Sequence, residues 1–459
     1  IRSLQGAVEA LELESLDDEI DRTMLLDTMR SLEFEFTDGR PHRRNPAFWL
    51  VRVAEVLDRG LATDNAVGLR PLLRELPALL ETAATTLEKP PRLFLDLGKD
   101  LLGPVLERVH RAAGVARGTL GDPDTEALAR GATDAAERFA VTLRHELTPD
   151  DDEHAFGVGE TETDRLLHHR DAIPTGGSAT LQRLSRTVPA LEAELADLAT
   201  SLGIGSWQEL VTAAGAARTA GDPLEAVRQA IGRGPGVAAR LGLPRVEPLA
   251  VLAASDVIAR VDPVGRLIGR GGPLALEVVA RTGLAARAPV LAANFVMPGQ
   301  ASLLEGRRSA PSLVRRTLGS SSALIGFGLY AEELWLELPG ETGPALRLLQ
   351  RADLFRRTLV GAVDLGLHMK RLSPAEATRS LMSRLPLSAS EAGVELSRIA
   401  LRPLEAAASL ETRASLLVLR SDWLKRRGPG AALAQFHAEL FRFGAMPTSL
   451  VRWGLGVDA

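Results

Sequence analysis

Residues 181–195 read Leu-Gln-Arg-Leu-Ser-Arg-Thr-Val-Pro-Ala-Leu-Glu-Ala-Glu-Leu, and the spacing of their apolar side chains indicates how the chain folds. Leucine or valine recurs every three or four residues, which is the period of one face of an α-helix. The same spacing recurs in residues 72–80, which contain Pro77, and in almost every other segment, whereas alternating strand-like runs are rare. The sequence therefore predicts an all-α protein.

Clusters of Pro, Gly and Asp separate the helical segments, at residues 121–123, 148–150, 173–177 and 232–236. Residues 373–376, Ser-Pro-Ala-Glu, combine an N-cap, a first-turn proline and a capping acid, and so predict the start of a helix. Because helices average about a dozen residues, we expect about fifteen to twenty of them.

The chain carries no internal repeat and no long low-complexity linker, so we expect one large helical domain over residues 1–459. Its N-terminal half (1–240) is expected to be helical, and its C-terminal half (241–459) to carry the functional site. Residues 243–251, Leu-Pro-Arg-Val-Glu-Pro-Leu-Ala-Val, are too rich in proline for a helix. We expect at most a very small β element there, a short strand pair.

The composition excludes several classes of function. The 459 residues include no cysteine, which excludes disulfides, thiolate metal ligands and a cysteine nucleophile. A net charge of −5 and a single Tyr argue against a nucleic-acid partner. No apolar stretch is long enough to cross a bilayer, so no membrane insertion is expected. The chain starts at Ile1 without Met or a signal-peptide core, which leaves room for preceding residues and makes the cytoplasm the default expectation.

Three weaker motifs have ordinary structural explanations. The acidic run at 150–153 lacks the oxygen spacing of a calcium loop and indicates a solvated loop. Glycine clusters near Gly234 and at 269–272 follow no strand and lack a Gly-Lys-Ser/Thr ending, so they indicate turns. His145 is followed by Glu as in a zinc-protease helix, but Pro149 occupies the second ligand position.

Polar side chains at helical spacing are more informative in the C-terminal part. Tyr330 lies near the end of a glycine-spaced helical segment. Asp364 and His368 are one turn apart, and Glu395 and Arg398 make a second pair at helical spacing. Each pair alone would be an ordinary helix-face interaction, and their order along the chain gives them more weight.

That order, together with residues 16–26 and 46–50, resembles the bacterial Domain of Unknown Function 885 family. Proteins of this family are mostly helical and zincin-like, and they are regarded as candidate metallopeptidases. Members carry the segments His-Glu-x-Tyr-Pro-Gly-His, Glu-Gly-Trp-Ala-Leu-Tyr-Ala-Glu, Asp-x-Gly-x-His and Glu-x-x-Arg-Tyr in that order. The resemblance covers nearly the whole chain and implies a large helical zincin-like fold.

The first motif has lost its metal chemistry in this chain. Asn294 stands in place of the first His, Phe295 in place of the catalytic Glu, and Gln300 in place of the second His. Pro298 and Gly299 match the family.

In the second motif Ile325 replaces the first Glu, the expected third ligand, whereas the later motifs keep Asp364, His368, Glu395 and Arg398. The amides of Asn and Gln are neutral, and Phe or Ile in place of Glu removes a carboxylate. The resemblance therefore implies a site without metal, no cofactor and no zinc-peptidase activity.

We expect a pseudoenzyme, a degenerate homologue that keeps the helical shell and binds a small-molecule ligand or an intact homologous protein. Asn294 and Gln300 would line a pocket at the former metal site, and Phe295 and Ile325 would form its apolar wall. Arg398 would hold an anionic group of the ligand.

The alternative is a repurposed, metal-independent enzyme of specialised metabolism, which would explain why polar groups survive beside lost ligands. Its candidate catalytic residues are His368, Asp364, Glu395, Arg398 and Tyr330. The opposite expectation is that these residues form a solid helix–helix clamp with no cavity.

Overall fold

The computed structural model describes residues 1–62, 66–217, 222–247, 249–261, 264–268, 274–338, 340 and 343–457. Helices make up 75% of the structure, which confirms the predicted all-α class. The described part of the chain holds 23 α-helices and two π-helical turns, more than the sequence predicted, because several helices are only one or two turns long. No helix in these ranges is both long and apolar enough to span a membrane.

The elements before the sheet are α1 (Arg2–Glu9), α2 (Leu16–Phe34), η1 (Glu35–Gly39), α3 (Pro41–Arg44), α4 (Pro46–Ala62), α5 (Ala66–Thr86), α6 (Arg92–Leu120), α7 (Pro123–Val141), η2 (Thr142–Glu146), α8 (Glu160–Asp171), α9 (Gly176–Ser201), α10 (Trp207–Ala216), α11 (Pro223–Gly232) and α12 (Gly234–Leu241).

The remaining elements are β1 (Ala250–Ala253), α13 (Asp256–Val261), β2 (Gly265–Ile268), β3 (Ala275–Val278), α14 (Leu284–Phe295), α15 (Gln300–Arg307), α16 (Leu313–Thr317), α17 (Ser321–Glu337), α18 (Pro344–His368), α19 (Pro374–Arg384), α20 (Ala389–Leu401), α21 (Glu405–Arg427), α22 (Leu433–Phe441) and α23 (Thr448–Gly454).

Local sequence signals explain several helices. The predicted capping box forms at the start of α19, where the side chain of Ser373 accepts from the Glu376 N–H and the Glu376 side chain accepts from the Ser373 N–H. Helix α5 continues through Pro77. In α9 the periodic apolar residues of the stretch at 181–195 are buried, namely Leu184, Val188, Leu191 and Leu195.

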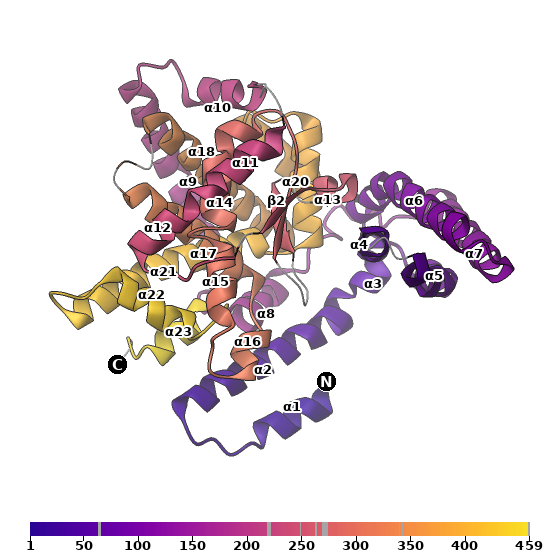
Figure 1. Cartoon of the computed structure of the whole chain (residues 1–459), viewed down its shortest axis with the longest axis horizontal. Coiled ribbons are helices and arrows are strands. Elements are labelled where there is room, and N and C mark those ends of the chain that lie inside the picture. The colour runs from indigo at the N-terminus through magenta and orange to yellow at the C-terminus, as the bar shows by residue number, and fades with distance from the viewer. Residues whose placement is uncertain are drawn as a thin grey trace.

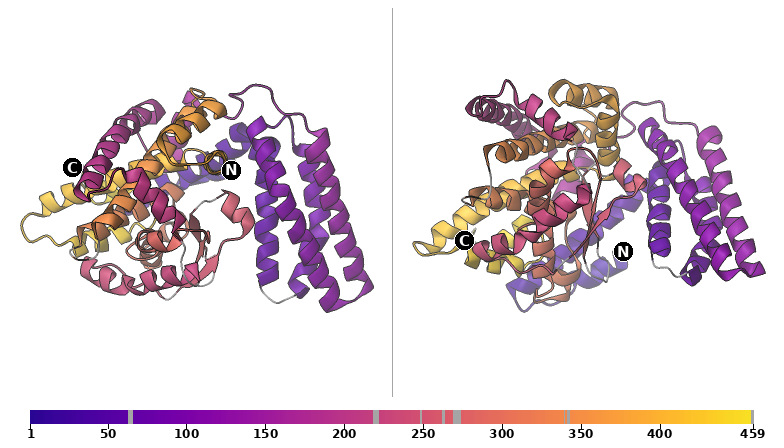
Figure 2. Two further views of the ribbon diagram at one scale, coloured as in Figure 1. Left: turned by 90° about the horizontal axis from the view of Figure 1, so that it is seen from above. Right: turned by 45° about the horizontal axis from the view of Figure 1, so that its top comes forward.

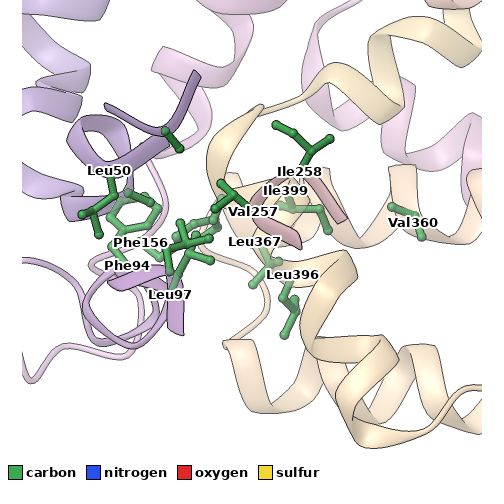
Figure 3. Close-up of a cluster of buried hydrophobic side chains, with 14 of the residues drawn as sticks. Leu50, Phe94, Leu97, Phe156, Val257, Ile258, Val360, Leu367, Leu396 and Ile399 are labelled. Atoms are coloured by element: carbon green, nitrogen blue, oxygen red, sulfur yellow. The ribbon is translucent and has the colours of Figure 1, made fainter. Parts of the chain in front are cut away.

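Helices α4 to α7 form an elongated bundle that stands to one side of the other helices (Figures 1 and 2). Arg108 of α6 ties this bundle to the rest of the molecule, because its guanidinium donates to Asp58 of α4 at 2.9 Å and to Asp256 of α13 at 2.6 Å. A buried apolar seam lies at the same junction. Figure 3 labels its side chains, Leu50, Phe94, Leu97, Phe156, Val257, Ile258, Val360, Leu367, Leu396 and Ile399.

The buried apolar side chains form two clusters. The first runs from the bundle through α9 and α18 to α20. The second joins α2 to α11, α12, α14, α17 and the last three helices. Neither cluster follows the boundary between residues 1–240 and 241–459, and the organisation as one domain stays a prediction.

The sheet is larger than the sequence predicted and lies later in the chain. Its strand order is β1-β3-β2, with β1 parallel and β2 antiparallel to β3. The strand pair predicted at 243–251 is corrected to three strands, the first of which begins at Ala250. Residues 243–247 form no strand, and Pro248 and the glycine cluster at 269–272 lie outside the described residues.

Candidate functional site

The turn at residues 296–299 brings Gln300 next to Asn294. Helix α14 ends at Phe295 and α15 begins at Gln300. A Cβ added to Gly299 would lie 1.8 Å from the carbonyl oxygen of Asn294, so the chain turns back this tightly only with glycine there. Gln300 Nε2 then donates a hydrogen bond of 2.9 Å to Asn294 Oδ1. The Pro-Gly break thus joins the two amides that the family resemblance places at the histidine positions.

The buried carboxylate of Glu332 accepts hydrogen bonds from two side-chain amides. Asn294 Nδ2 donates to Glu332 Oε1 at 2.6 Å, and Gln350 Nε2 donates to Glu332 Oε2 at 2.9 Å. Burial raises the pKa of Glu332, although the charge of Arg357 opposes this shift. Because Asn294 donates to Glu332 and accepts from Gln300, both ends of its amide are engaged.

Gly328 lets α17 approach α14 closely enough for these hydrogen bonds. A Cβ at this position would lie 2.8 Å from Asn294 Oδ1 and 3.0 Å from Gln300 Cγ. Any larger residue would displace the side chains of Asn294 and Gln300. The close approach of α17 to α14 therefore depends on glycine at position 328.

Asn294, Phe295 and Gln300 line a cavity of about 270 Å³, together with Ile325 of α17. The four positions to which the family resemblance assigns the lost metal chemistry therefore face one space. Further apolar wall comes from β2, α17 and α18, through Leu267, Leu324 and Val360.

Charged side chains from four segments also line the described part of this cavity, namely Arg266, Arg356, Arg357, Glu395, Arg398, Arg402 and Glu405. Arg266 is held by Glu55 at 2.6 Å and by Glu277 at 2.8 Å. Arg356 donates a hydrogen bond to Glu395. Burial lowers the pKa of Arg356 to about 9, so this arginine still carries its charge at neutral pH.

Arg398 and Arg357 are held less tightly than these two. Arg398 Nε lies 3.8 Å from Glu395 Oε2, and its Nη1 lies 3.9 Å from Glu405 Oε1. Arg357 Nη2 lies 3.9 Å from Glu332 Oε1. These separations exceed hydrogen-bond distance. The Nε of Arg357 is buried and has no hydrogen-bond partner in the described part of the chain.

Asp364 and His368 form a buried pair that does not line the cavity. His368 Nε2 lies 3.5 Å from Asp364 Oδ1, which accepts a hydrogen bond of 2.9 Å from the Leu404 N–H. Burial raises the pKa of Asp364 to about 7 and lowers the pKa of His368 to about 3. The histidine ring packs on Phe156, with 4.9 Å between ring centroids. The structure therefore places His368 against the apolar seam rather than at the cavity.

Tyr330 also lies away from the cavity. Its hydroxyl is 3.0 Å from His437 Nε2, and His437 Nδ1 is 3.0 Å from the carbonyl oxygen of Leu241. The carbonyl can only accept, so Nδ1 carries the proton and the Tyr330 hydroxyl donates to Nε2. Burial raises the pKa of Tyr330. This arrangement joins α12, α17 and α22, which is a structural role.

Sequence reasoning missed Arg356, Arg357 and Glu405 as site residues. Two adjacent arginines in the largely apolar segment 344–368 were the available signal, because a charged side chain inside a buried helix needs a partner or a cavity. Glu405 is the first residue of α21 and lies seven positions after Arg398, so its place in the sequence was a second signal.

The family resemblance implies a zinc site in intact relatives. The side chains at this cavity do not fit a zinc ion. Zinc is bound by imidazole, thiolate or carboxylate groups. Asn294 and Gln300 offer amides that are bonded to each other, and Phe295 and Ile325 offer no ligand atom. In the described ranges, no group of three or more His, Cys, Asp or Glu is arranged to hold a metal.

The fold and the site define a large helical protein with an arginine-lined cavity between α14, α17, α18 and α20. The model of a family described as bacterial protein of unknown function (DUF885) matches residues 285–454, which carry most of the cavity. The predicted resemblance to this family is confirmed for that part of the chain, with the family's metal ligands replaced.

Two solved structures share this fold over 99% of the chain. One is a candidate lipoprotein of unknown function from Shewanella oneidensis, with a TM-score of 0.74, 14% identity and 90% of that chain covered. The other is a candidate lipoprotein from Colwellia psychrerythraea, with a TM-score of 0.81, 14% identity and 89% covered. At such identity the likeness shows the fold alone. The comparison with curated proteins gave no match.

The cytoplasmic location expected from the sequence is contradicted by these two neighbours. Both are described as candidate lipoproteins, and lipoproteins are attached to the cell envelope. The expectation was a default, because neither a targeting segment nor the cysteine content of the numbered residues pointed to a compartment.

Proposed function

We propose that this protein is a metal-free pseudoenzyme that binds a small, mostly apolar molecule with an anionic group in the cavity at the former metal site. One observation carries the proposal. The positions that replace the metal chemistry, Asn294, Phe295, Gln300 and Ile325, line a single cavity together with Arg398. A solid helix–helix clamp would leave no such space.

The apolar wall suits a short hydrocarbon. Phe295 and Ile325 stand where the family carries carboxylates, and Leu267, Leu324 and Val360 extend the same surface. Each CH₂ group transferred from water to such a surface contributes about 0.8 kcal/mol.

Arg398 supplies the recognition of the anion. Its nearest carboxylates, on Glu395 and Glu405, lie 3.8 Å and 3.9 Å away, so its N–H groups retain donor capacity toward the cavity. Glu395 already accepts from Arg356 and therefore neutralises Arg398 only in part. A planar guanidinium binds a carboxylate through two parallel hydrogen bonds.

The alternative, a repurposed enzyme, has less support. His368 and Asp364 do not line the cavity, and the Tyr330 hydroxyl is used by His437. A binding role needs no general base. Binding of an intact homologous protein stays a prediction.

Calorimetric titration with hexanoate tests the proposal. We expect saturable binding to the unaltered protein and at least tenfold weaker binding to Arg398→Gln, a difference of about 1.4 kcal/mol. Arg130→Gln serves as the matched control, because this arginine is 67% exposed on α7. Equal binding by the unaltered protein and by Arg398→Gln, or no binding of butyrate, hexanoate or octanoate, would contradict the proposal.

A further inference from the structure

Besides Arg398, the cavity is lined by a second arginine with only a long carboxylate contact, Arg357 of α18. We infer that the ligand carries two anionic groups joined by a short apolar chain, as in a dicarboxylate, with one group on Arg398 and the other on Arg357. This inference rests on the proposed function and specifies the class of ligand.

Arg357 also lines a second, smaller cavity. Arg356 and Arg357 line both the main cavity and an inner one of about 20 Å³, which Glu332 and Asp353 also line. A space of that size holds about one water molecule. Arg357 therefore lies where the two spaces adjoin and can be reached by a ligand in the main cavity.

Hydrogen-bond capacity singles out the same residue. Arg357 Nη2 is 3.9 Å from Glu332, and the buried Nε has no hydrogen-bond partner in the described ranges. Glu332 already accepts from Asn294 and Gln350. A buried N–H group that lacks a hydrogen-bond partner is costly, and a bound carboxylate would supply one to the Arg357 Nε.

The other lining arginines have closer carboxylates. Arg266 donates to two glutamates, Arg356 donates to Glu395, and Arg402 lies 3.5 Å from Glu405. Within the described part of the chain, the carboxylate contacts of Arg357 and Arg398 are 3.8 Å or longer. Two loosely held cations at one cavity with an apolar wall fit an anion at each end of a hydrocarbon.

The test compares acids of equal length. Hexanoate and adipate both have six carbons, and glutarate and pimelate bracket the distance between the two charges. We expect the best diacid to bind at least tenfold more tightly than its monoacid. Arg357→Gln should remove this preference and weaken hexanoate binding far less than Arg398→Gln does, whereas Arg357→Lys should keep part of the preference.

The outcomes separate this inference from the proposed function. If the diacids bind no better than the monoacids, or if Arg357→Gln keeps the preference, the two-anion ligand is rejected, while hexanoate binding that depends on Arg398 still supports the proposed function. Loss of all acid binding in the unaltered protein would reject both. Circular dichroism shows whether Arg357→Gln folds. If it does not, the affinities for diacid and monoacid are measured with Arg357→Lys instead. A ratio of these affinities equal to that of the unaltered protein would then reject the inference.

Discussion

Arginines contact carboxylates in two regions, at the junction of the helical bundle with the other helices and at the cavity. The distances of these contacts differ between the two regions. At the seam, Arg108 is 4% exposed and donates to Asp58 at 2.9 Å, to Asp256 at 2.6 Å and to a backbone carbonyl at 2.8 Å. At the cavity, Arg398 comes no closer than 3.8 Å to Glu395. Short bonds from every nitrogen hold helices together, whereas long contacts beside a cavity leave donors for a ligand.

Removing the seam arginine should have the largest effect on stability. We expect Arg108→Gln to lower the free energy of unfolding by about 2–4 kcal/mol, because it removes charged hydrogen bonds to Asp58 and Asp256 and one to a backbone carbonyl. Arg398→Gln should lower it by less than about 1 kcal/mol, since its ion contacts are long. Urea denaturation of both variants measures the difference, and equal losses would break the distinction between the two regions.

Glycine substitutions sharpen the same comparison. Gly328→Ala should lower the free energy of unfolding by about 1–3 kcal/mol, because its Cβ would press on the Asn294 side chain and overpack the site. Gly114→Ala in α6 meets nothing within 4 Å, so it should stabilise the bundle by about 0.5–1 kcal/mol through higher helix propensity. Thermal and urea unfolding would detect opposite signs. A neutral Gly328→Ala would argue against close packing of α17 on α14.

The buried Asp364–His368 pair predicts a pH effect of intermediate size. The pKa of Asp364 is raised from 3.8 to about 7, so its contribution to stability is complete below pH 3.8 and is lost as the pH rises through 7. The pKa of His368 is lowered from 6.5 to about 3, so its contribution is complete above pH 6.5 and is lost as the pH falls through 3. Between about pH 4 and 6.5 the two contributions oppose each other.

Asp364→Asn should remove one of these opposing contributions. The variant keeps the acceptor for the Leu404 N–H, and its stability should fall relative to the unaltered protein by about 1 kcal/mol per pH unit as the pH drops from 6.5 to 5. Melting temperatures at three pH values in that window measure the slope. Parallel curves for both proteins would mean that the pair does not titrate as its burial implies.

The smallest expected effect is that of a chelator. Because Asn294, Gln300 and Ile325 offer no zinc ligands, dialysis against EDTA should leave the melting temperature unchanged. Elemental analysis of the purified protein is the second readout. One zinc per chain that survives dialysis would contradict the interpretation of the site.

The features that could be predicted from the sequence are those set by residues close to one another along the chain. The capping box at Ser373 and the buried face of α9 follow from spacing within one helix. The meeting of Asn294 and Gln300 follows from a tight turn between them. The sheet was placed too early, because β1 and β2 both pair with β3, and such pairing is set by residues distant in sequence.

The rest of the site depends on how helices pack. Arg357 and Glu405 reach the cavity only because α18 packs beside α21, which no single segment reveals. His368 turns away from the cavity because its ring packs on Phe156, which precedes it by more than two hundred residues. Periodicity identifies a buried helix face, but it does not say which neighbour covers that face.

A crystal structure with 6-bromohexanoate tests the central claim most directly, because the anomalous signal of bromine locates the ligand. We predict the carboxylate within about 3 Å of the Arg398 guanidinium, at hydrogen-bond distance, and bromine inside the cavity beyond Phe295. Bromine found only outside the cavity, or Arg398 bonded directly to Glu395 and Glu405 with side chains filling the space, would contradict the account.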